Sequence, residues 1–571
     1  MRIRRILILR GTAAGVLVGP HAIPSHTLQS LQPLTKVVFC SFSLQLVLGK
    51  DCQVTLVVIL PRRSVFDSVS SDGQREFRLA LVVISIHYPS TAMTAFTQLP
   101  NELLENIILH SLPEGFESLA LTCKHLYTLC TPHIKHHNRL RWHFESFEYG
   151  KTDLVVQHKL SLLTLPYTVC SAFNLIARIA VEPTVAHYIG EADFQKDGQF
   201  TRGISRTFAT DASRDKAVTK LLAESSYLRE AGLEWQEYYA AIEDDLDAAR
   251  YSQHAAAFVL TLLPNLKVLK LPREWKPVAA TNKLLEVIMR RSRGAPIPHH
   301  KPSMAQVSRF EVSASRDVDE SFHLDWATYF LILPHVRSFW GLGCVGTGDG
   351  YGAITSAYLP NGFQSLEAVH FMSASIDDKA IAGFLKHTPN LKTLRYSHTT
   401  NNNGGLQDWD LCRFVAAIER EAGSHLVELS ISIDELRGSI TPGKVSMRGF
   451  CRLEKLELPL EITICTLHAL GEHQPNFSDL FLGDLIPASV SQLSLISHGM
   501  DGWEKALNML FRDFAARKGS QVPALKEIYL SWPIDVDDLD EKQYATLAVE
   551  TQKAGVALDI MSDPLTWDGE E

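Results

Sequence analysis

A short pattern of apolar residues, L-x-x-L-x-L with aliphatic or aromatic side chains at the marked positions, recurs through the second half of the chain and limits its possible folds. Two instances are near copies, LPNLKVLKL at 263–271 and TPNLKTLRY at 388–396. Looser instances are VRSFWG (336–341), LEAVHF (366–371), LVELSI (426–431), LEKLEL (453–458), VSQLSL (490–495), LKEIYL (525–530) and, more divergent, HYIGEADF (187–194).

The spacing of these instances indicates a repeat. Counted from Leu266, successive first positions lie 70, 30, 25, 35, 27, 37 and 35 residues apart. A period of 25 to 37 residues accommodates one strand and one returning helix, which is the unit of a repeat solenoid. The gap of 70 residues leaves room for a missed repeat or an insertion.

Apolar residues with helical spacing precede three of these segments, as a strand–helix repeat requires. They are Ala380, Ile381, Phe384 and Leu385 before the segment at 391, Phe414, Val415 and Ile418 before 426, and Leu507, Leu510, Phe511 and Phe514 before 525. Within LKVLKL, alternation places Leu269 and Leu271 on one side of a strand and Lys270 on the other. The pattern predicts an α/β fold in which a parallel sheet curves into an arc with outer helices, over residues 263–545.

A second informative stretch is LPNELLENIILHSLPEGFESLALTCKHLYTLC, residues 99–130, which predicts two short helices. Pro100 suits the first turn of the first helix, and Glu102 complements its dipole. The expected apolar positions are Leu103, Leu104, Ile107 and Ile108 on the first helix, and Leu119, Cys123, Leu126 and Cys130 on the second, with a break at Pro113 and Gly115 and an end at Pro132. A piece this small is near the lower limit for independent folding, so we expect its stripes to pack partly against a partner.

From Pro100 to Cys123 this stretch resembles the F-box in order and spacing: LP, an acidic residue, an aliphatic stripe and an aliphatic-rich second helix. Leu126–Tyr127 departs from the family, in which many members carry Trp or Phe. The resemblance implies docking onto the Skp-type adaptor of a cullin–RING (SCF-type) ubiquitin ligase. The adaptor-binding residues that it implies are Leu99, Pro100, Leu103, Leu104, Ile107, Ile108, Leu119, Cys123 and Leu126.

The irregular repeats are similar to the degenerate leucine-rich repeats of fungal F-box proteins. Together the two resemblances imply the substrate-recognition subunit of such a ligase, with a helical F-box on the adaptor and the repeat arc on a protein target. A subunit of this kind is not an enzyme, needs no cofactor, and acts in the cytoplasm, the nucleus or both. The sequence leaves open an alternative, a repeat scaffold that binds proteins without a ubiquitin-ligase role.

These patterns divide the chain into segments. We expect a weakly structured extension at 1–92, the F-box at 93–145, a mostly helical linker with the first divergent repeats at 146–262, the repeats at 263–545 and an acidic C-terminal tail at 546–571. Within the linker, 224–251 has the pattern of one helix. We also expect Met93, just before the first well-patterned helix, to be the physiological start, with residues 1–92 an artefact of the gene model.

Charge and short apolar runs argue against nucleic-acid and membrane partners. The net charge is -9, which provides no global field for polyanions. The basic run HIKHHNRLR (133–141) lacks interleaved stacking aromatics. The runs VTLVVIL (54–60) and LALVVISI (79–86) are well short of the roughly 18 apolar residues of a membrane span.

Motifs for catalysis and metal binding are missing from the sequence. The nine cysteines are scattered without a C-x-x-C pair, which is typical of a reduced intracellular protein. A Cys/His group between Cys123 and His137 does not complete a tetrahedral zinc set. The glycine-rich stretch 341–352 fits neither a dinucleotide-binding nor a P-loop pattern. Because no nucleophile stands with its base, we predict no catalytic site, and we predict no metal site.

Overall fold

The structure is a computed structural model. It describes residues 47–48, 54–61, 79–86, 98–150, 152–153, 167–197, 212–294, 301–313, 321–348, 362–400, 408–463, 481–497, 503–531 and 541–561. The chain divides into two compact units, Met1–Ser90 and Thr91–Glu571. Two expectations lie outside the described residues: Met93 as the start, and the final part of the acidic tail, 562–571.

The first unit contains an antiparallel sheet in the order β1 (Val47–Leu48), β2 (Val54–Pro61), β3 (Leu79–Ile86). Strands β2 and β3 coincide with the two apolar runs of the sequence. The apolar pattern of each run does not by itself indicate that the two strands pair with each other.

The second unit opens with three helices, α2 (Asn101–His110), α3 (Phe116–Ala120) and α4 (Lys124–Phe144). The expected first helix is confirmed. Pro100 stands just before α2, and its carbonyl accepts hydrogen bonds from the N–H groups of Leu103 and Leu104 at 3.0 and 3.1 Å. Because these are the first helical bonds, the chain enters α2 directly from the proline.

The expected second helix is wrong in two respects. The chain breaks after α3, and Cys123 becomes the residue that precedes α4. Pro132 lies inside α4 instead of ending a helix. A proline in a helix interior costs about 3 kcal/mol. Burial of α4 side chains on both sides of Pro132, such as Leu126 and Leu140, offsets that cost.

Helices dominate the next part of the chain: α5 (Ala172–Val181), α6 (Val185–Tyr188), α7 (Ala212–Ala223), α8 (Ser226–Glu230), α9 (Trp235–Asp247) and α10 (Gln253–Val259), beside the strand pair β5 (Thr152–Asp153) and β6 (Tyr167–Thr168). Serines 171, 225 and 252 begin α5, α8 and α10 by accepting a backbone N–H at 3.3 Å. The single helix expected over 224–251 is wrong. Helices α8 and α9 separate at Gly232, whose φ of 65° is a conformation that favours glycine.

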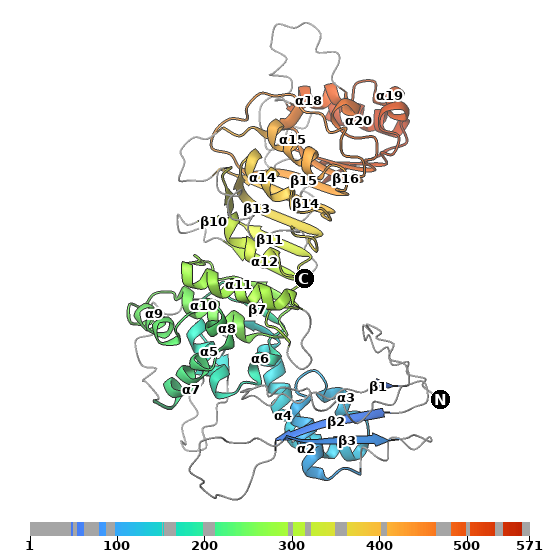
Figure 1. Cartoon of the computed structure of the whole chain (residues 1–571). Helices are drawn as coiled ribbons and strands as arrows, with labels where there is room; N and C mark the ends of the chain where they lie inside the picture. Colours follow the sequence, from blue (N-terminus) through green and yellow to red (C-terminus); the bar gives the residue numbers. More distant parts are fainter. Residues whose placement is uncertain are drawn as a thin grey trace, which may run out of the picture. The chain divides into compact units, whose positions relative to one another are not determined.

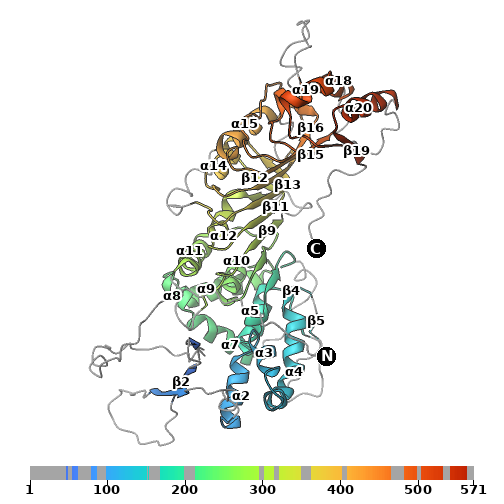
Figure 2. The ribbon, with the colours of Figure 1, turned by 90° about the vertical axis from the view of Figure 1, so that its right-hand side faces the viewer.

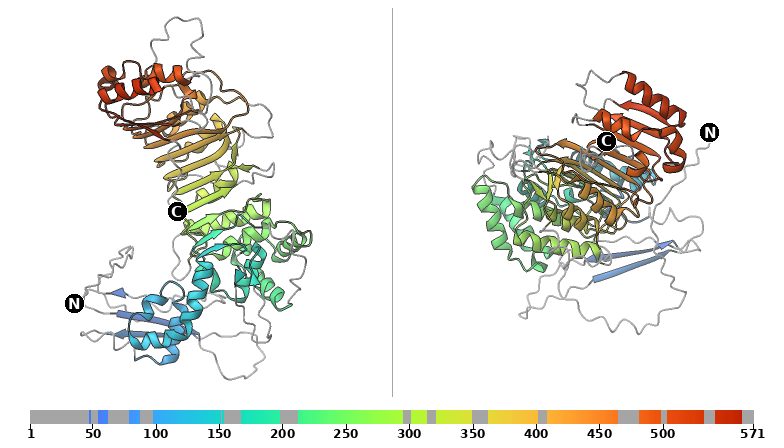
Figure 3. Two further views of the ribbon diagram at one scale, coloured as in Figure 1. Left: turned by 180° about the vertical axis from the view of Figure 1, so that it is seen from behind. Right: turned by 90° about the horizontal axis from the view of Figure 1, so that it is seen from above.

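Fourteen of the described strands form one sheet with parallel pairing. They are β4 (Ser146–Glu148), β7 (Glu191–Asp193), β8 (Val268–Lys270), β9 (Arg309–Ser313), β10 (Phe322–His323), β11 (Ser338–Leu342), β12 (Cys344–Gly346), β13 (Ala368–Ile376), β14 (Thr393–Thr399), β15 (Glu428–Glu435), β16 (Lys455–Pro459), β17 (Gln492–Ile496), β18 (Glu527–Ser531) and β19 (Ala557–Met561). They follow one another in chain order, with β10 and β12 as a side branch beside β13. Figure 3 shows this succession from behind.

Every repeat places the same motif position at the same level of the sheet. The fourth position forms a continuous ladder, in which Leu269 pairs with Phe310, Phe310 with Phe339, and Leu394 with Leu429. The members of this ladder, each no more than 2% exposed, are Phe147, Ala192, Leu269, Phe310, Phe339, Val369, Leu394, Leu429, Leu456, Leu493 and Ile528. The ladder is therefore one apolar row that runs across the strands, within a larger buried core to which the helices also contribute.

Outer helices return the chain between strands: α11 (Ala279–Arg293), α12 (Thr328–Leu331), α14 (Asp378–Leu385), α15 (Leu411–Ala422), α17 (Leu482–Leu485), α18 (Trp503–Leu510), α19 (Phe514–Gln521) and α20 (Glu541–Lys553), with 3-10 turns η2 (Leu260–Leu262) and η3 (Leu324–Ala327). Figures 1 and 2 show α11, α12, α14 and α15 along one face of the sheet. The expected stripes before 391 and 426 are confirmed as α14 and α15. The stripe before 525 is divided between α18 and α19, with Asp513 at a φ of 53° between them.

The strands predicted from the repeat pattern are confirmed, including the divergent one, which holds β7. The gap of 70 residues contains a missed repeat, VSRFEV (307–312), in β9, and FESFEY (144–149) holds the missed strand β4. The chain is therefore a mixed α/β protein with a long parallel sheet and outer helices.

Candidate docking surface on helices α2 to α4

Helices α2, α3 and α4 share a small core of their own. Ile108, Phe116, Ala120 and Cys130 form a buried cluster, against which Leu112, Leu119, Leu129 and Ile134 pack. Helix α2 contacts α4, and so does α3. Because this cluster uses side chains from all three helices, it fixes the positions of the residues that remain on the surface.

The nine residues implied as adaptor-binding divide into two groups in the structure. Leu104, Ile108 and Leu126 are fully buried within the chain. The others keep surface area: Pro100 is exposed, and Leu99, Leu103, Ile107, Leu119 and Cys123 are half-buried. A buried residue has no surface to offer a partner, so Leu104, Ile108 and Leu126 support the helices that carry the surface.

Large exposed apolar side chains are concentrated on these three helices and on the link between α3 and α4. Seven such side chains occur among the described residues, and four of them lie here: Leu109, Leu121, Tyr127 and Trp142, at 44%, 79%, 52% and 81% exposure. Single exposed apolar residues are normal, but a concentration in one small unit marks a candidate interaction site. Sequence reasoning missed these four because they lie off the apolar stripes that define each helix.

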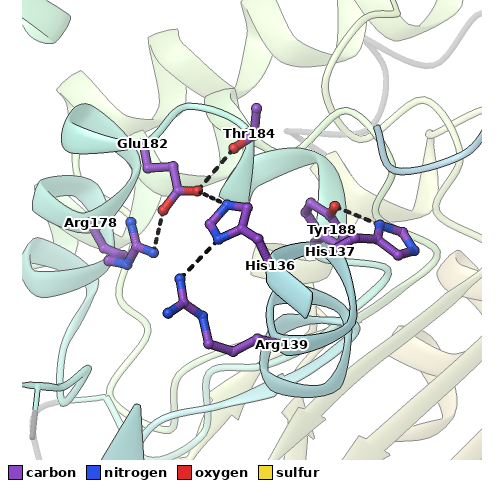
Figure 4. Close-up of polar contacts among 7 residues, drawn as sticks. All are labelled: His136, His137, Arg139, Arg178, Glu182, Thr184 and Tyr188. Atoms are coloured by element: carbon purple, nitrogen blue, oxygen red, sulfur yellow. Dashed lines mark hydrogen bonds and ion pairs between the residues drawn. The ribbon is translucent and has the colours of Figure 1, made fainter. Parts of the chain in front are cut away.

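Helix α4 is joined to the repeat-bearing part through a group of polar contacts with the α5–α6 region (Figure 4). His136 Nε2 lies 2.7 Å from Glu182 Oε1, and Arg178 donates to Glu182 Oε2 at 2.6 Å. From the next residue of α4, the Nδ1 of His137 lies 2.8 Å from the hydroxyl of Tyr188. Side chains of α4 thereby connect helices α2 to α4 to the helices that follow them.

Burial and charge set the protonation of this group. Burial by itself would raise the pKa of Glu182, but its hydrogen bonds and charge interactions with Arg178 and His136 lower that pKa overall. Burial lowers the pKa of His137, and the neighbouring carboxylate of Glu117 opposes this effect only in part. At neutral pH Glu182 is therefore an anion between two nitrogen-bearing side chains.

The sheet face opposite the ladder carries polar and aromatic side chains, because successive strand residues point to opposite faces. Trp340 stacks on His370 with ring centroids 4.0 Å apart, and the guanidinium of Arg309 lies 5.0 Å from the Trp340 ring centroid. Arg395 Nη2 lies 2.6 Å from Glu428 Oε1. Burial, reinforced by the charges of Arg395 and Arg309, lowers the pKa of His370 to about 4.

Glu457 is the most buried carboxylate among the strand residues of that face, at 5% exposure. Ser430 donates to its Oε1 at 2.5 Å. Burial raises the pKa of Glu457, although hydrogen bonds from Ser430 and Ser494 oppose the rise. This face therefore carries cross-strand ion pairs and one carboxyl group, that of Glu457, whose ionised form is disfavoured by burial.

Over the described residues, no group of three or more His, Cys, Asp and Glu side chains is arranged to hold a metal ion. The described helices include none that is both long enough and apolar enough to cross a membrane. The chain matches no model of a known protein family and no curated protein.

Proposed function

We propose that this protein is the substrate-recognition subunit of a cullin–RING ubiquitin ligase. In this proposal α2 to α4 act as an F-box that binds a Skp-type adaptor, and the strands of the long parallel sheet with their helices act as leucine-rich-repeat-like units that bind a protein target. The observation that carries the proposal is the concentration of exposed apolar side chains on α2 to α4, on a unit that has its own small core.

The surface residues refine which side chains contact the adaptor. Leu103 and Ile107 are half-buried on one face of α2, and Leu121 and Tyr127 are more than half exposed at the junction of α3 and α4. Apolar and aromatic side chains of this kind provide most of the binding free energy in protein interfaces.

A binding measurement tests the proposal. The purified full chain is expected to bind a purified Skp-type adaptor, and L121D combined with Y127D is expected to weaken binding by roughly tenfold or more. V181D is the control, because Val181 is a comparably exposed apolar residue, at 59%, on α5. Absence of adaptor binding by the unsubstituted chain, or equal losses in both variants, would exclude the proposal. Co-purification of a cullin with the chain separates a ligase subunit from a scaffold without ligase role.

A further inference from the structure

A groove with a volume of about 500 Å³ runs along the edge of the sheet where strands β11, β13, β14, β15 and β16 begin. The charged and titratable residues that line it are Arg337, Lys392, Arg452, His335, His425 and Glu367. They come from the segments that lead into five neighbouring strands. The groove is thus assembled by the repeat and not by one loop.

Backbone hydrogen bonds fix the order of residues along this edge. The N–H of Glu367 donates to Arg337 O, that of Lys392 to Glu367 O, and that of Val427 to Lys392 O, each at 2.8 Å. Glu454 follows Val427 in the same way. These residues share the second motif position, so their side chains start from equivalent places on successive strands. Basic and acidic residues alternate along this row, and Arg452 lies two residues before Glu454.

The charges in the groove do not cancel. Lys392 Nζ lies 2.9 Å from Glu367 Oε2, and the hydrogen bond from Lys392 lowers the pKa of Glu367, which is therefore an anion at neutral pH. Arg337 and Arg452 form no ion pair or side-chain hydrogen bond with any residue in the part of the chain that the structure describes. Burial lowers the pKa of His425, so this histidine adds no charge at neutral pH. The charge of Arg337 also lowers the pKa of Glu367, so the groove holds three cations around one carboxylate, on a protein whose net charge is -9.

We propose that this groove binds an acidic peptide segment in an extended conformation. Arg337, Lys392 and Arg452 belong to the segments before β11, β14 and β16, which are every second strand in this part of the sheet. Arg337 and Lys392 share one motif position, and Arg452 lies two residues before the equivalent position on its own segment. Two strand spacings are about 9.5 Å. Three residues of an extended polyproline II chain, with a rise of about 3.1 Å each, span about the same distance and complete one turn, so every third side chain faces the same side. Carboxylates three residues apart therefore match the spacing of Arg337 and Lys392, and guanidinium groups such as those of Arg337 and Arg452 bind carboxylates with two parallel hydrogen bonds.

The groove favours a peptide over a single-stranded nucleic acid. Binding of single strands combines cations with aromatic side chains on which bases stack. The residues that line this groove include no Phe, Tyr or Trp. The inference is independent of the proposed ligase role, because none of these residues lies on α2 to α4 and the ligand is tested without an adaptor.

Fluorescence anisotropy with a labelled peptide of about twelve residues, with Asp at every third position, tests the proposal on the full chain. Binding is expected at low ionic strength and is expected to weaken as salt rises. R337E combined with R452E is expected to weaken binding by about tenfold or more. The matched control is K267E combined with K526E, because Lys267 and Lys526 are exposed at the motif position of Arg337 and lie outside the groove.

The outcomes separate the alternatives. A loss confined to the groove variant supports the proposal, as does loss of binding when Asn replaces Asp in the peptide. Equal losses in both variants would mean that binding is non-specific attraction, and no binding by the unsubstituted chain would also overturn the proposal. A single-stranded oligonucleotide that binds the groove more tightly than the peptide would replace it with a nucleic-acid site. R337Q combined with R452Q removes charge without reversing it and provides a second variant should the first fail to fold.

Discussion

His136 Nε2 lies 2.7 Å from Glu182 Oε1, and this contact joins helix α4 to the residue that follows α5. The same carboxylate accepts from Arg178, whose side chain is only 8% exposed. Glu182 therefore connects α4, which carries part of the candidate docking surface, to the buried side chain of Arg178 on α5. The link explains how a small helical unit is held on a large repeat protein.

Glu182→Ala is expected to lower the free energy of unfolding by about 3 kcal/mol, because it leaves the buried Arg178 guanidinium without its carboxylate. Unfolding of the full chain in guanidinium chloride measures this change in the free energy of unfolding. The control is Glu145→Ala, which removes the exposed i,i+4 pair with Arg141 on α4 and is expected to cost less than about 1 kcal/mol. Similar losses in the two variants would show that the Glu182 contacts add no more than a surface pair.

The repeat pattern predicted the sheet well because its information is local. An apolar residue at the fourth motif position, such as Leu269 or Leu394, is buried wherever the strand lies, so periodicity alone finds it. VSRFEV (307–312) carries apolar residues at all three marked positions, Val307, Phe310 and Val312, so the same pattern also identifies this repeat. Strand order and parallel pairing then follow from the short returns between repeats.

The candidate docking surface was less predictable. Whether Leu104 or Leu103 faces a partner depends on how α2 packs against α4, which a stripe of apolar residues on one helix does not specify. The break before α4 and the continuation of the helix through Pro132 both depend on tertiary burial, which outweighs local propensity. The basic groove joins residues that are more than 100 positions apart, such as Arg337 and Arg452, and no local motif brings them together.

Leu104 and Leu121 are expected to respond oppositely to substitution. Leu104→Ala removes a fully buried side chain and is expected to cost about 2–5 kcal/mol of stability. Leu121→Ala alters a side chain that is 79% exposed and is expected to change stability by less than about 0.5 kcal/mol while weakening adaptor binding. Thermal unfolding and adaptor binding of both variants check the pair. A stable Leu104→Ala variant would contradict the core position of Leu104.

Two adjacent residues of strand β14 are also expected to differ in how much their substitution lowers stability. Leu394 is fully buried and pairs with Val369 and Leu429, whereas the adjacent Thr393 is only half-buried and points to the other face. Leu394→Ala is expected to lower stability by about 2–5 kcal/mol. Thr393→Ala is the control and is expected to change stability by about 0.5 kcal/mol or less. Denaturant unfolding of the two variants measures the difference, and equal effects would contradict the observed strand register.

Stability is expected to fall as the pH drops below about 6.5, and His370 is one cause. Burial lowers the pKa of His370 from 6.5 to about 4, so between these values the unfolded chain binds a proton that the folded chain does not. Well above pH 6.5 neither state binds this proton. Near pH 5 the extra proton on the unfolded chain lowers the free energy of unfolding by about 2 kcal/mol. His370→Phe removes the titrating group and keeps a ring against Trp340, so the loss between pH 7.5 and pH 5 is expected to shrink by about 2 kcal/mol. His398, whose pKa burial also lowers to about 4, accounts for a separate part of the loss, so a double variant is expected to flatten the profile further. An unchanged pH profile in His370→Phe would mean that His370 is protonated in the folded protein.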